Sequence, residues 1–322
     1  MGRVNLRTAF LYPGQGAQYV GMGQDFYDAY PVAKAVFAQA DAVLQKNLTK
    51  TVFEGPQEVL SQTENTQSAM LTVCTAITQL LEEHGVSASH AAGLSLGEYA
   101  ALVAAGTLPF SEAVQLVEDR ARFMQEAVPQ GIGGMTAVLG LSADDVQAAV
   151  RKGQNAGEVY VANYNAPGQI VITGTKEGLQ AAGEEAENRG AQRLIPLDVS
   201  APFHSPLLDP AKKRLAERLQ TVVFSPLTKR VYANVDARPI ASEQDIPALL
   251  ARQVTGSIYF QQSIQAMLEE GVSRFIEIGP GKTLTGFVKR IAREQGAAPK
   301  LVNIRTVDDF TAFIRQEKEM KA

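Results

Sequence analysis

The chain has 322 residues, of which 45% are hydrophobic and 20% charged, with a formal net charge of −4. This composition is ordinary for a globular protein, and a slightly acidic chain has no overall positive field to attract nucleic acid or an anionic membrane. The single cysteine, Cys74, excludes an intrachain disulfide, and its apolar neighbours predict a buried thiol rather than a reactive one.

The N-terminal third of the chain predicts alternating strands and helices. MGRVNLRTAFLYPG lacks the apolar core and cleavage site of a signal peptide, so we expect a cytoplasmic protein. Residues 7–16 predict a short buried strand that ends in a glycine-rich turn, and helical patterns then continue to Gly85, which is typical of a helix C-terminus. Residues 89–95 predict a second buried strand, followed by a helix over 96–106. This alternation favours a parallel α/β sheet.

A smaller unit is predicted for residues 129–199. Its expected order is strand, helix, two strands, helix and strand, with Ser142 as an N-cap and Pro167-Gly168 in the turn between the middle strands. This β-α-β-β-α-β order is the ferredoxin-like pattern. We therefore expect an inserted subdomain with hinges near 131–134 and 199–202. Residues 1–128 and 200–322 then form the large domain, and 314–322 predict a fraying polar helix.

The most informative short motif is Gly93-Leu94-Ser95-Leu96-Gly97, which fits the G-x-S-x-G pattern. In that pattern a serine lies on a sharp turn between a strand and a helix, with its hydroxyl exposed. The predicted strand before Ser95 and the predicted helix after it provide this context. The alternative is an ordinary helix N-cap serine, with Glu98 three residues later completing a capping box.

A serine nucleophile needs a base, and the chain offers only three histidines. His84 falls at a predicted helix C-terminus, where an imidazole is commonly stabilising. His90 begins the strand that leads to Ser95 and so lies at its opposite end. His204 lies in the loop SAPFHSPLL, where flanking prolines can hold the ring rigidly. Elimination therefore predicts His204 as the general base.

The group that would orient the His204 ring is less evident. Asp198 and Asp209 are near in sequence, but neither occupies a persuasive position. The acceptor for the imidazole N–H can also be a backbone carbonyl, so these candidates stay open at this point.

Arg120 stands out on the predicted helix over 111–128. At 100° per residue it falls within an apolar arc, whose members are Ala113, Leu116, Val117, Met124 and Ala127. A guanidinium directed inward is costly unless it is paired. Its partner can be a structural carboxylate or the carboxylate of a ligand, for which arginine is a suitable bidentate clamp.

Two glycine-rich segments are not nucleotide sites. Gly14-Gln15-Gly16 follows the first strand, but Tyr19 stands where G-x-G-x-x-G requires glycine; such a loop can instead supply an oxyanion donor. GPGKT at 279–283 resembles the end of a P-loop, but Ile276 stands at its first glycine position. No His/Cys cluster has the spacing of a metal site, so no metal is expected.

The chain resembles the malonyl-CoA:acyl carrier protein transacylases of type II fatty acid synthesis over about residues 7–305. Six motifs in order carry the likeness: PGQGAQ (13–18), GLSLGEYAAL (93–102), RARFMQEAVP (120–129), NYNAPGQIVITG (163–174), APFHSPLL (201–208) and IEIGPGKTLTGF (276–287). The resemblance implies an α/β-hydrolase-like large domain with a parallel sheet and an inserted ferredoxin-like subdomain. One departure is Leu94, where many members have histidine.

The resemblance also implies roles for individual residues. Ser95 would be the nucleophile, His204 the base and Arg120 the clamp for the malonyl carboxylate. The remaining implied site residues are Gln15 and Leu96 as oxyanion donors, Gln253 as the carbonyl that orients His204, Asn165 as a pocket residue, and Phe203 as the bulk that disfavours an α-methyl branch.

The implied activity is malonyl transfer from malonyl-CoA to the phosphopantetheine thiol of acyl carrier protein, through a malonyl-serine intermediate and without a cofactor. Acyl carrier proteins are acidic, so Lys282, Lys289 and Arg290 are candidate contacts, against the alternative of plain solvated charge. We expect a monomer that contacts neither nucleic acid nor membrane. The rival readings are a trans-acting polyketide synthase acyltransferase, a serine acyl hydrolase, against which Arg120 argues, and a non-catalytic docking subunit.

Overall fold

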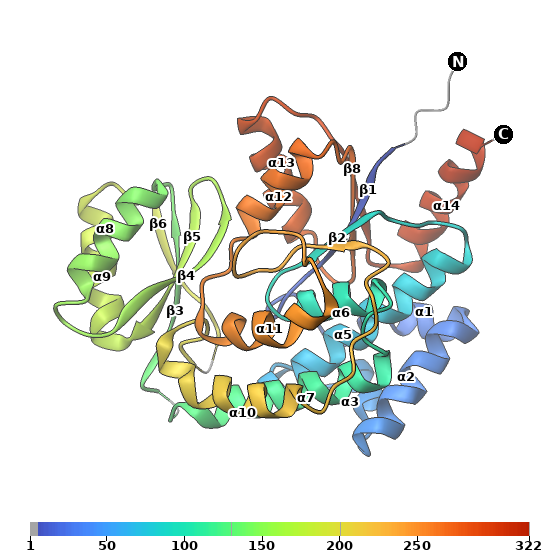
Figure 1. Ribbon diagram of the computed structural model, residues 1–322, viewed down its shortest axis with the longest axis horizontal. Helices are drawn as coiled ribbons and strands as arrows, with labels where there is room; N and C mark the ends of the chain where they lie inside the picture. Colours follow the sequence, from blue (N-terminus) through green and yellow to red (C-terminus); the bar gives the residue numbers. More distant parts are fainter. Residues whose placement is uncertain (1–5, 130, 200, 322) are drawn as a thin grey trace.

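The computed structural model describes residues 6–129, 131–199 and 201–321 as a larger α/β unit beside a smaller one (Figure 1). Residues 1–5, part of the segment without signal-peptide features, lie outside the described residues. So do 130, 322 and 200, the last of which is within the second predicted hinge.

The larger unit is built on a five-stranded sheet with the order β7-β2-β1-β8-β9, and every pairing in it is parallel. Its strands are β1 (Thr8–Tyr12), β2 (His90–Gly93), β7 (Arg230–Val231), β8 (Arg274–Ile278) and β9 (Lys300–Ile304). β1, β2 and β8 are buried along their whole length, as expected for strands with both faces covered by helices. The parallel α/β sheet predicted from the alternation of elements is confirmed.

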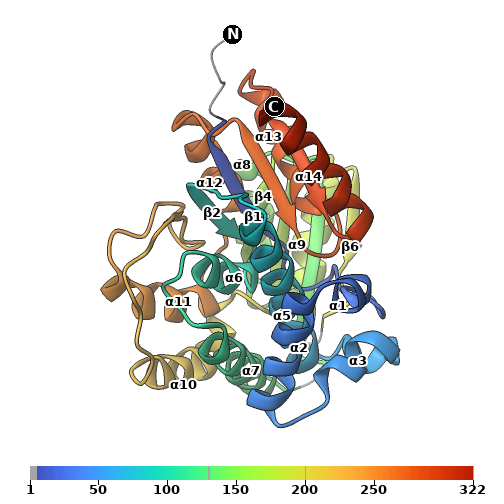
Figure 2. The same cartoon turned by 90° about the vertical axis from the view of Figure 1, so that its right-hand side faces the viewer.

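Helices pack around this sheet (Figure 2). Before β2 these are α1 (Gln24–Ala29), α2 (Pro31–Leu44), α3 (Leu48–Glu54), α4 (Gln57–Leu60) and α5 (Thr63–Glu83), and after it α6 (Gly97–Ala104) and α7 (Phe110–Ala127). The later ones are η1 (Pro206–Leu208), α10 (Asp209–Leu219), η2 (Glu243–Asp245), α11 (Ile246–Thr255), α12 (Phe260–Glu269), α13 (Thr283–Glu294) and α14 (Val307–Lys321). Gly85 follows the α5 C-cap His84 with φ 72°, as predicted.

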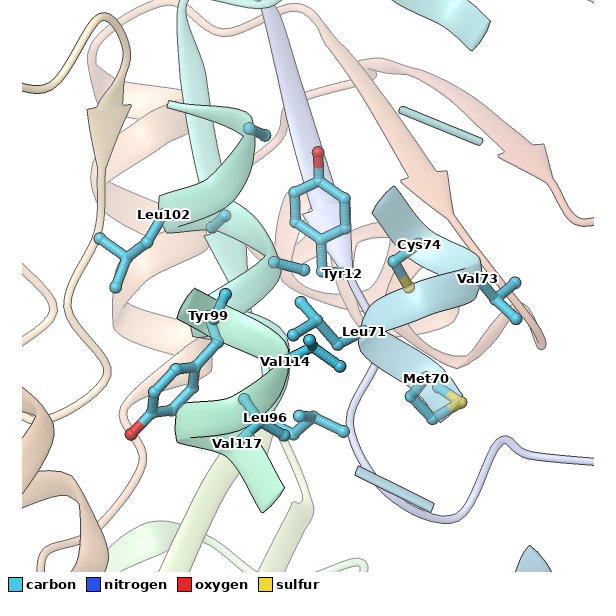
Figure 3. Packing of buried hydrophobic residues seen from close by; sticks show 14 of the residues in the cluster. Tyr12, Met70, Leu71, Val73, Cys74, Leu96, Tyr99, Leu102, Val114 and Val117 are labelled. Carbon is cyan, nitrogen blue, oxygen red and sulfur yellow. The ribbon is translucent and has the colours of Figure 1, made fainter. Parts of the chain in front are cut away.

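The core of the larger unit lies where α5, α6 and α7 meet the sheet (Figure 3). In that view Tyr12 of β1, Leu71 of α5 and Val114 of α7 lie close together. Cys74 of α5 is 1% exposed, and its Sγ contacts the Ile278 carbonyl at 3.3 Å. The predicted burial of this cysteine is confirmed, and burial raises the pKa of its thiol well above the ordinary value.

The smaller unit is a four-stranded antiparallel sheet with the order β4-β5-β3-β6. Its elements are β3 (Gly133–Leu139), α8 (Ala143–Gly153), β4 (Val159–Ala166), β5 (Gln169–Thr175), α9 (Lys176–Asn188) and β6 (Arg193–Pro196). This is the predicted β-α-β-β-α-β order. Ser142 caps α8 by accepting from the Asp145 N–H, and Gly168 has φ 67° in the β4–β5 turn.

The C-terminal helix differs from the prediction of a fraying polar tail. α14 already begins at Val307, and its residues Phe310 and Phe313 are buried. The Phe310 ring meets Phe26, Tyr30 and His84 edge-on. Beyond Phe313, Ile314 is buried as well, and Glu317 pairs with Arg274 at 2.6 Å, so the helix packs on the larger unit well past residue 313. None of the helices described is both long and apolar enough to cross a membrane.

The carboxyl ends of β1 and β2 approach each other closely because glycines line the contact. A Cβ on Gly97 would overlap the Tyr12 carbonyl oxygen, and one on Gly14 would come within 2.6 Å of the Leu94 carbonyl oxygen. Ligands of open α/β sheets bind at the carboxyl ends of the strands. The fold therefore brings the loop after β1 against the turn that carries Ser95.

Gly97→Ala is expected to destabilise the protein strongly, because backbone on both sides of this contact leaves no room for a methyl group. We expect a loss of about 2–4 kcal/mol in the free energy of unfolding, measured by urea denaturation followed by circular dichroism. Gly286→Ala is the matched control, since a Cβ there meets nothing within 4 Å. Equal stability of the two variants would contradict the close approach.

Candidate active site

Ser95 lies on a sharp turn between β2 and α6. Its φ is 54°, in the left-handed region that a non-glycine residue rarely adopts. Its backbone N–H donates to Asn234 Oδ1 at 2.7 Å, and its Oγ lies 2.8 Å from His204 Nε2. The side chain does not cap α6, whose N-cap is Leu96. The capping-box alternative is therefore wrong, because the Ser95 hydroxyl and the Glu98 carboxylate both have other partners.

His204 reaches Ser95 from the loop between β6 and η1. It is 4% exposed, and its φ is 58°. Its Nδ1 lies 2.9 Å from the Gln253 backbone carbonyl, to which it must donate its proton. Nε2 therefore presents a lone pair to the Ser95 hydroxyl. Asp198 is exposed and Asp209 pairs with Lys213 at 2.9 Å, so of the candidates left open the carbonyl orients the ring.

Arg120 points inward from α7, as the helical wheel predicts, and is 1% exposed. Of the arc that surrounds it, Ala113, Leu116, Val117 and Met124 are buried, and Ala127 is half-buried. Its Nη1 donates to Gln67 Oε1 at 2.6 Å, and its Nη2 donates to Gln253 Oε1 at 2.9 Å and to Ser95 Oγ at 3.1 Å. These acceptors are neutral. The buried guanidinium thus lies beside the serine, and no carboxylate in the described part of the chain pairs with it.

Glu98 of α6 links Gln253, which meets Arg120, to Asn234, which meets Ser95. Its side chain is buried, with 1% exposed. Its Oε2 accepts from Gln253 Nε2 at 2.7 Å and from the Asn234 backbone N–H at 3.1 Å. Asn234 in turn donates from Nδ2 to the Gly93 carbonyl at 2.7 Å. A buried polar network that is connected in this way holds its members rigidly.

Burial sets the protonation states of the site. Burial first, and then the Arg120 charge, lower the pKa of His204 from 6.5 to about 4, although the bond to Gln253 acts in the opposite direction. Burial raises the pKa of Glu98 to about 7, against the hydrogen bonds from Gln253 and Asn234. Burial also lowers the pKa of Arg120, yet a guanidinium remains charged at neutral pH. A neutral imidazole beside a serine is the arrangement of an activated nucleophile.

The rate of reaction at Ser95 should therefore keep its full value well below the ordinary histidine pKa. Protonated His204 cannot accept the serine proton, so activity falls as pH drops through the pKa of about 4. We expect kcat/KM to be level above about pH 5 and to fall about tenfold per pH unit below pH 4. Rapid-quench rates of serine acylation, with circular dichroism to verify folding, measure this profile. An acid limb centred near 6.5 would contradict it.

Gln15 and Leu96 lie on the two segments that meet at the Ser95 turn. Leu96 directly follows Ser95, and Gln15 lies in the loop that Gly14 packs against the Leu94 carbonyl. Within the described residues, neither backbone N–H has a hydrogen-bond partner. Two unpaired N–H groups beside a nucleophile can receive a developing oxyanion.

Phe203 and Asn165 are the remaining predicted site residues, and both are buried. Phe203 precedes His204 and is 6% exposed, packed within the core of the larger unit. Asn165, near the end of β4, is also 6% exposed, and its Oδ1 has no partner among the described residues. His90 is apart from the site and contacts Glu270 at 3.0 Å. No group of His, Cys, Asp and Glu side chains in the described part of the chain could hold a metal ion.

Sequence reasoning missed Gln67 and Asn234, and it assigned Glu98 only to a capping box. Gln67 gave no local signal, because it lies in the polar first turns of α5, between Thr66 and Ser68. Asn234 follows the end of β7, at the same edge of the sheet as Ser95. Its bond to Ser95 joins residues 139 positions apart, which no local pattern indicates.

Known proteins are similar to this chain over nearly its whole length. Residues 9–320 match the profile of the acyl transferase domain family. The chain is 45% identical over 288 residues to the malonyl CoA-acyl carrier protein transacylase of Bacillus subtilis, covering 89% of this chain and 91% of that protein. It is 42% identical over 284 residues to the Escherichia coli K12 protein of the same name, covering 88% and 92%.

Solved structures give the same result. The MCAT of Streptococcus pneumoniae matches with a TM-score of 0.90 and 45% identity, covering 96% of this chain and 99% of that one. A malonyl-transacylase in complex with its type II PKS acyl-carrier protein matches with a TM-score of 0.93 and 37% identity, covering 96% and 99%. The mixed architecture, with a parallel and a separate antiparallel sheet, is shared with these proteins. The chain belongs to the acyl transferase family, among the malonyl CoA-acyl carrier protein transacylases.

Proposed function

We propose that this protein transfers the malonyl group from malonyl-CoA to the phosphopantetheine thiol of acyl carrier protein. The observation that carries the proposal is the buried Arg120 guanidinium, 3.1 Å from Ser95 Oγ, whose hydrogen-bond acceptors among the described residues are all neutral. Such a charge lacks a carboxylate that a malonyl substrate supplies. A simple esterase has no use for this clamp, so the site favours malonyl transfer over general acyl hydrolysis.

The first half-reaction loads the serine. Malonyl-CoA binds with its carboxylate on Arg120, and Ser95 Oγ attacks the thioester carbonyl carbon while His204 Nε2 takes the hydroxyl proton. The backbone N–H groups of Gln15 and Leu96 hold the oxyanion, and one such donor contributes about 10²- to 10³-fold in rate. The C–S bond then breaks, and His204 gives its proton to the departing CoA thiolate.

The second half-reaction unloads the serine onto the carrier. The phosphopantetheine thiol gives its proton to His204 Nε2 and attacks the malonyl ester, and the same oxyanion donors hold the intermediate. The C–O bond to Ser95 breaks, and the serine recovers its proton. The overall scheme is ping-pong covalent catalysis, and its proton balance closes with Ser95 and His204 alone. We therefore propose that no metal or redox cofactor takes part.

Intact-mass measurement on the protein tests this function. Brief incubation with malonyl-CoA should add one malonyl group, and addition of holo acyl carrier protein should remove it and increase the carrier's mass by the same amount. Steady hydrolysis of malonyl-CoA without an adduct would support the serine hydrolase instead. No adduct and no turnover would refute both and favour a docking role.

A second candidate concerns the carrier protein. One solved relative is bound to a type II PKS acyl-carrier protein, so this chain could serve polyketide synthesis with the same chemistry. The two roles differ only in the partner. Transfer rates from the malonyl-loaded enzyme to a fatty acid and to a polyketide acyl carrier protein, compared side by side, decide between them.

We propose that the Phe203 side chain restricts the acyl group to malonyl. It is buried beside the base His204, where bulk leaves little space for an α-methyl branch. Phe203→Ala should raise the rate with methylmalonyl-CoA relative to malonyl-CoA by about tenfold, the effect of one methyl group in a fitted pocket. Competition between the two thioesters, read by adduct mass, measures the ratio. An unchanged ratio would place Phe203 outside the selective contacts.

For the carrier contact we propose Lys282, Lys289 and Arg290, all exposed on or beside α13. Arg290 also donates to the Pro167 carbonyl at 3.3 Å, so this helix lies against the smaller unit. Positive charge there suits an acidic carrier despite the net charge of −4. Charge reversal at Lys289 should weaken transfer at low salt and leave serine loading unchanged.

We also propose a domain organisation, an oligomeric state and a cellular location. Residues 1–128 and 200–322 would form an α/β-hydrolase-like catalytic domain, and residues 129–199 a ferredoxin-like subdomain. The two strand orders support this division. We propose a cytoplasmic monomer that contacts neither nucleic acid nor membrane, in keeping with the slightly acidic charge; light scattering after size-exclusion chromatography tests the monomer.

A further inference from the structure

The Gln253 side chain lies between Arg120 and Ser95 and forms a hydrogen bond with each. It is fully buried, and its Oε1 accepts from Arg120 Nη2 at 2.9 Å. Its Nε2 donates to the Ser95 carbonyl at 3.0 Å and to Glu98 Oε2 at 2.7 Å. The backbone carbonyl of the same residue holds His204. The amide is thus a separate contact from the one already assigned to Gln253.

The orientation of this amide has a chemical consequence for Arg120. If the amide flipped, its NH₂ group would face the guanidinium, a donor against a donor, and its oxygen would face the oxygens of Ser95 and Glu98. Buried donors and acceptors that lose their partners are costly. The acceptors on the Nε2 side therefore fix which end of the amide Arg120 meets.

Glu98 accepts the shortest of the hydrogen bonds that Gln253 Nε2 donates. Its Oε2 accepts from both Gln253 and the Asn234 N–H, whereas its Oε1 is buried and has no partner among the described residues. A proton on Glu98 can therefore lie on Oε1, which leaves Oε2 an acceptor in both protonation states. The charged groups that act on this carboxyl are Arg120 and, to a smaller extent, Asp236. The contact with Gln253 does not require the negative charge.

We propose that Glu98 is a positioning residue for malonyl recognition, which fixes the Gln253 amide so that its oxygen holds the Arg120 guanidinium beside Ser95. Glu98 touches neither the nucleophile's hydroxyl nor the base. It acts through Gln253 on Arg120. This inference rests on the proposed malonyl transfer, since it assigns the residue to the selection of a carboxylated acyl group.

The test compares malonyl with acetyl loading of Ser95 in two variants. Glu98→Leu removes the acceptor at similar size, and Glu98→Gln keeps an amide oxygen in the Oε2 position. For Glu98→Leu we expect kcat/KM for malonyl-CoA to fall about 10- to 100-fold. Loading from acetyl-CoA, which has no carboxylate for the clamp, should fall far less. Glu98→Gln should keep the wild-type ratio of malonyl to acetyl loading.

Glu277→Gln is the matched control, because Glu277 is another fully buried carboxylate that instead holds the start of α13 through Leu284 and Thr285. It should lower thermal stability without changing the malonyl-to-acetyl ratio. A Glu98→Leu protein that folds and keeps the wild-type ratio overturns the proposal, as does a Glu98→Gln protein that loses that ratio.

If Glu98→Leu does not fold, Gln253→Met provides the same test, since it removes the amide and keeps the backbone carbonyl on His204. Loss of the malonyl preference in Gln253→Met supports the action of the Gln253 amide on Arg120. A retained preference overturns the proposal. A wild type that forms no malonyl adduct would refute the proposed function and, with it, this inference. A wild type that loads normally beside an unaffected Glu98→Leu refutes the inference alone.

Discussion

Ser95→Ala is expected to abolish the malonyl adduct and to reduce transfer to acyl carrier protein by about 10⁴- to 10⁶-fold. The hydroxyl is the group that His204 Nε2 meets at 2.8 Å, so without it the covalent intermediate has no oxygen to form on. Intact-mass spectrometry after incubation with malonyl-CoA measures the adduct, and a coupled assay of CoA release measures turnover. The fold should survive, because alanine removes one oxygen only.

His204→Ala serves as the comparison within the same site. It removes the base and leaves the hydroxyl, so slow loading of Ser95 should remain detectable where Ser95→Ala shows none. Because nucleophile and base act as a unit, the double variant should be little worse than either single one. An adduct of normal stoichiometry on Ser95→Ala would mean that another side chain accepts the malonyl group.

The centre of the site could be predicted because each part has a local signal. The G-x-S-x-G turn lies between a strand and a helix, which marks Ser95. The choice of His204 needed only the elimination of His84 and His90, and the structure places both away from the serine. Arg120 was marked by a charge within an apolar arc. The signals for Ser95 and Arg120 depend on residues within one turn or helix, and the signal for His204 depends on the small number of histidines in the chain.

The supporting network could not be predicted, because its contacts join distant segments. Asn234 meets Ser95 across 139 positions, and Gln253 meets Glu98 across 155. The spacing of Ser95 and Glu98 also fits a capping box, the alternative that the structure excludes. Glu98 does not cap its own helix because its side chain is buried and bonds to Asn234 and Gln253.

Arg120→Met is expected to reverse the acyl preference rather than to stop the chemistry. Methionine keeps much of the buried volume and removes the charge that would bind the malonyl carboxylate. We expect kcat/KM for malonyl-CoA to fall about 10²- to 10³-fold, as for loss of one partner of a buried charge pair. Loading from acetyl-CoA should change by less than about tenfold. Adduct rates with the two thioesters measure both effects.

The same variant should also move the acid limb of the pH profile. The Arg120 charge is one cause of the lowered pKa of His204, after burial. Without that charge, protonation of the imidazole becomes easier, so the limb should shift upward from about pH 4 and stay below the ordinary value because burial remains. An acid limb that does not move would mean that burial alone lowers the pKa of His204.

Arg120→Lys separates charge from geometry. A lysine keeps the positive charge, so the pH profile should stay near that of the wild type, but its ammonium lacks the planar fork that meets Gln67 and Gln253 together. Malonyl loading should therefore lie between those of Arg120→Met and the wild type. If Arg120→Met instead kept the full preference for malonyl over acetyl, Arg120 would be a structural residue, and the carboxylate would have to bind elsewhere.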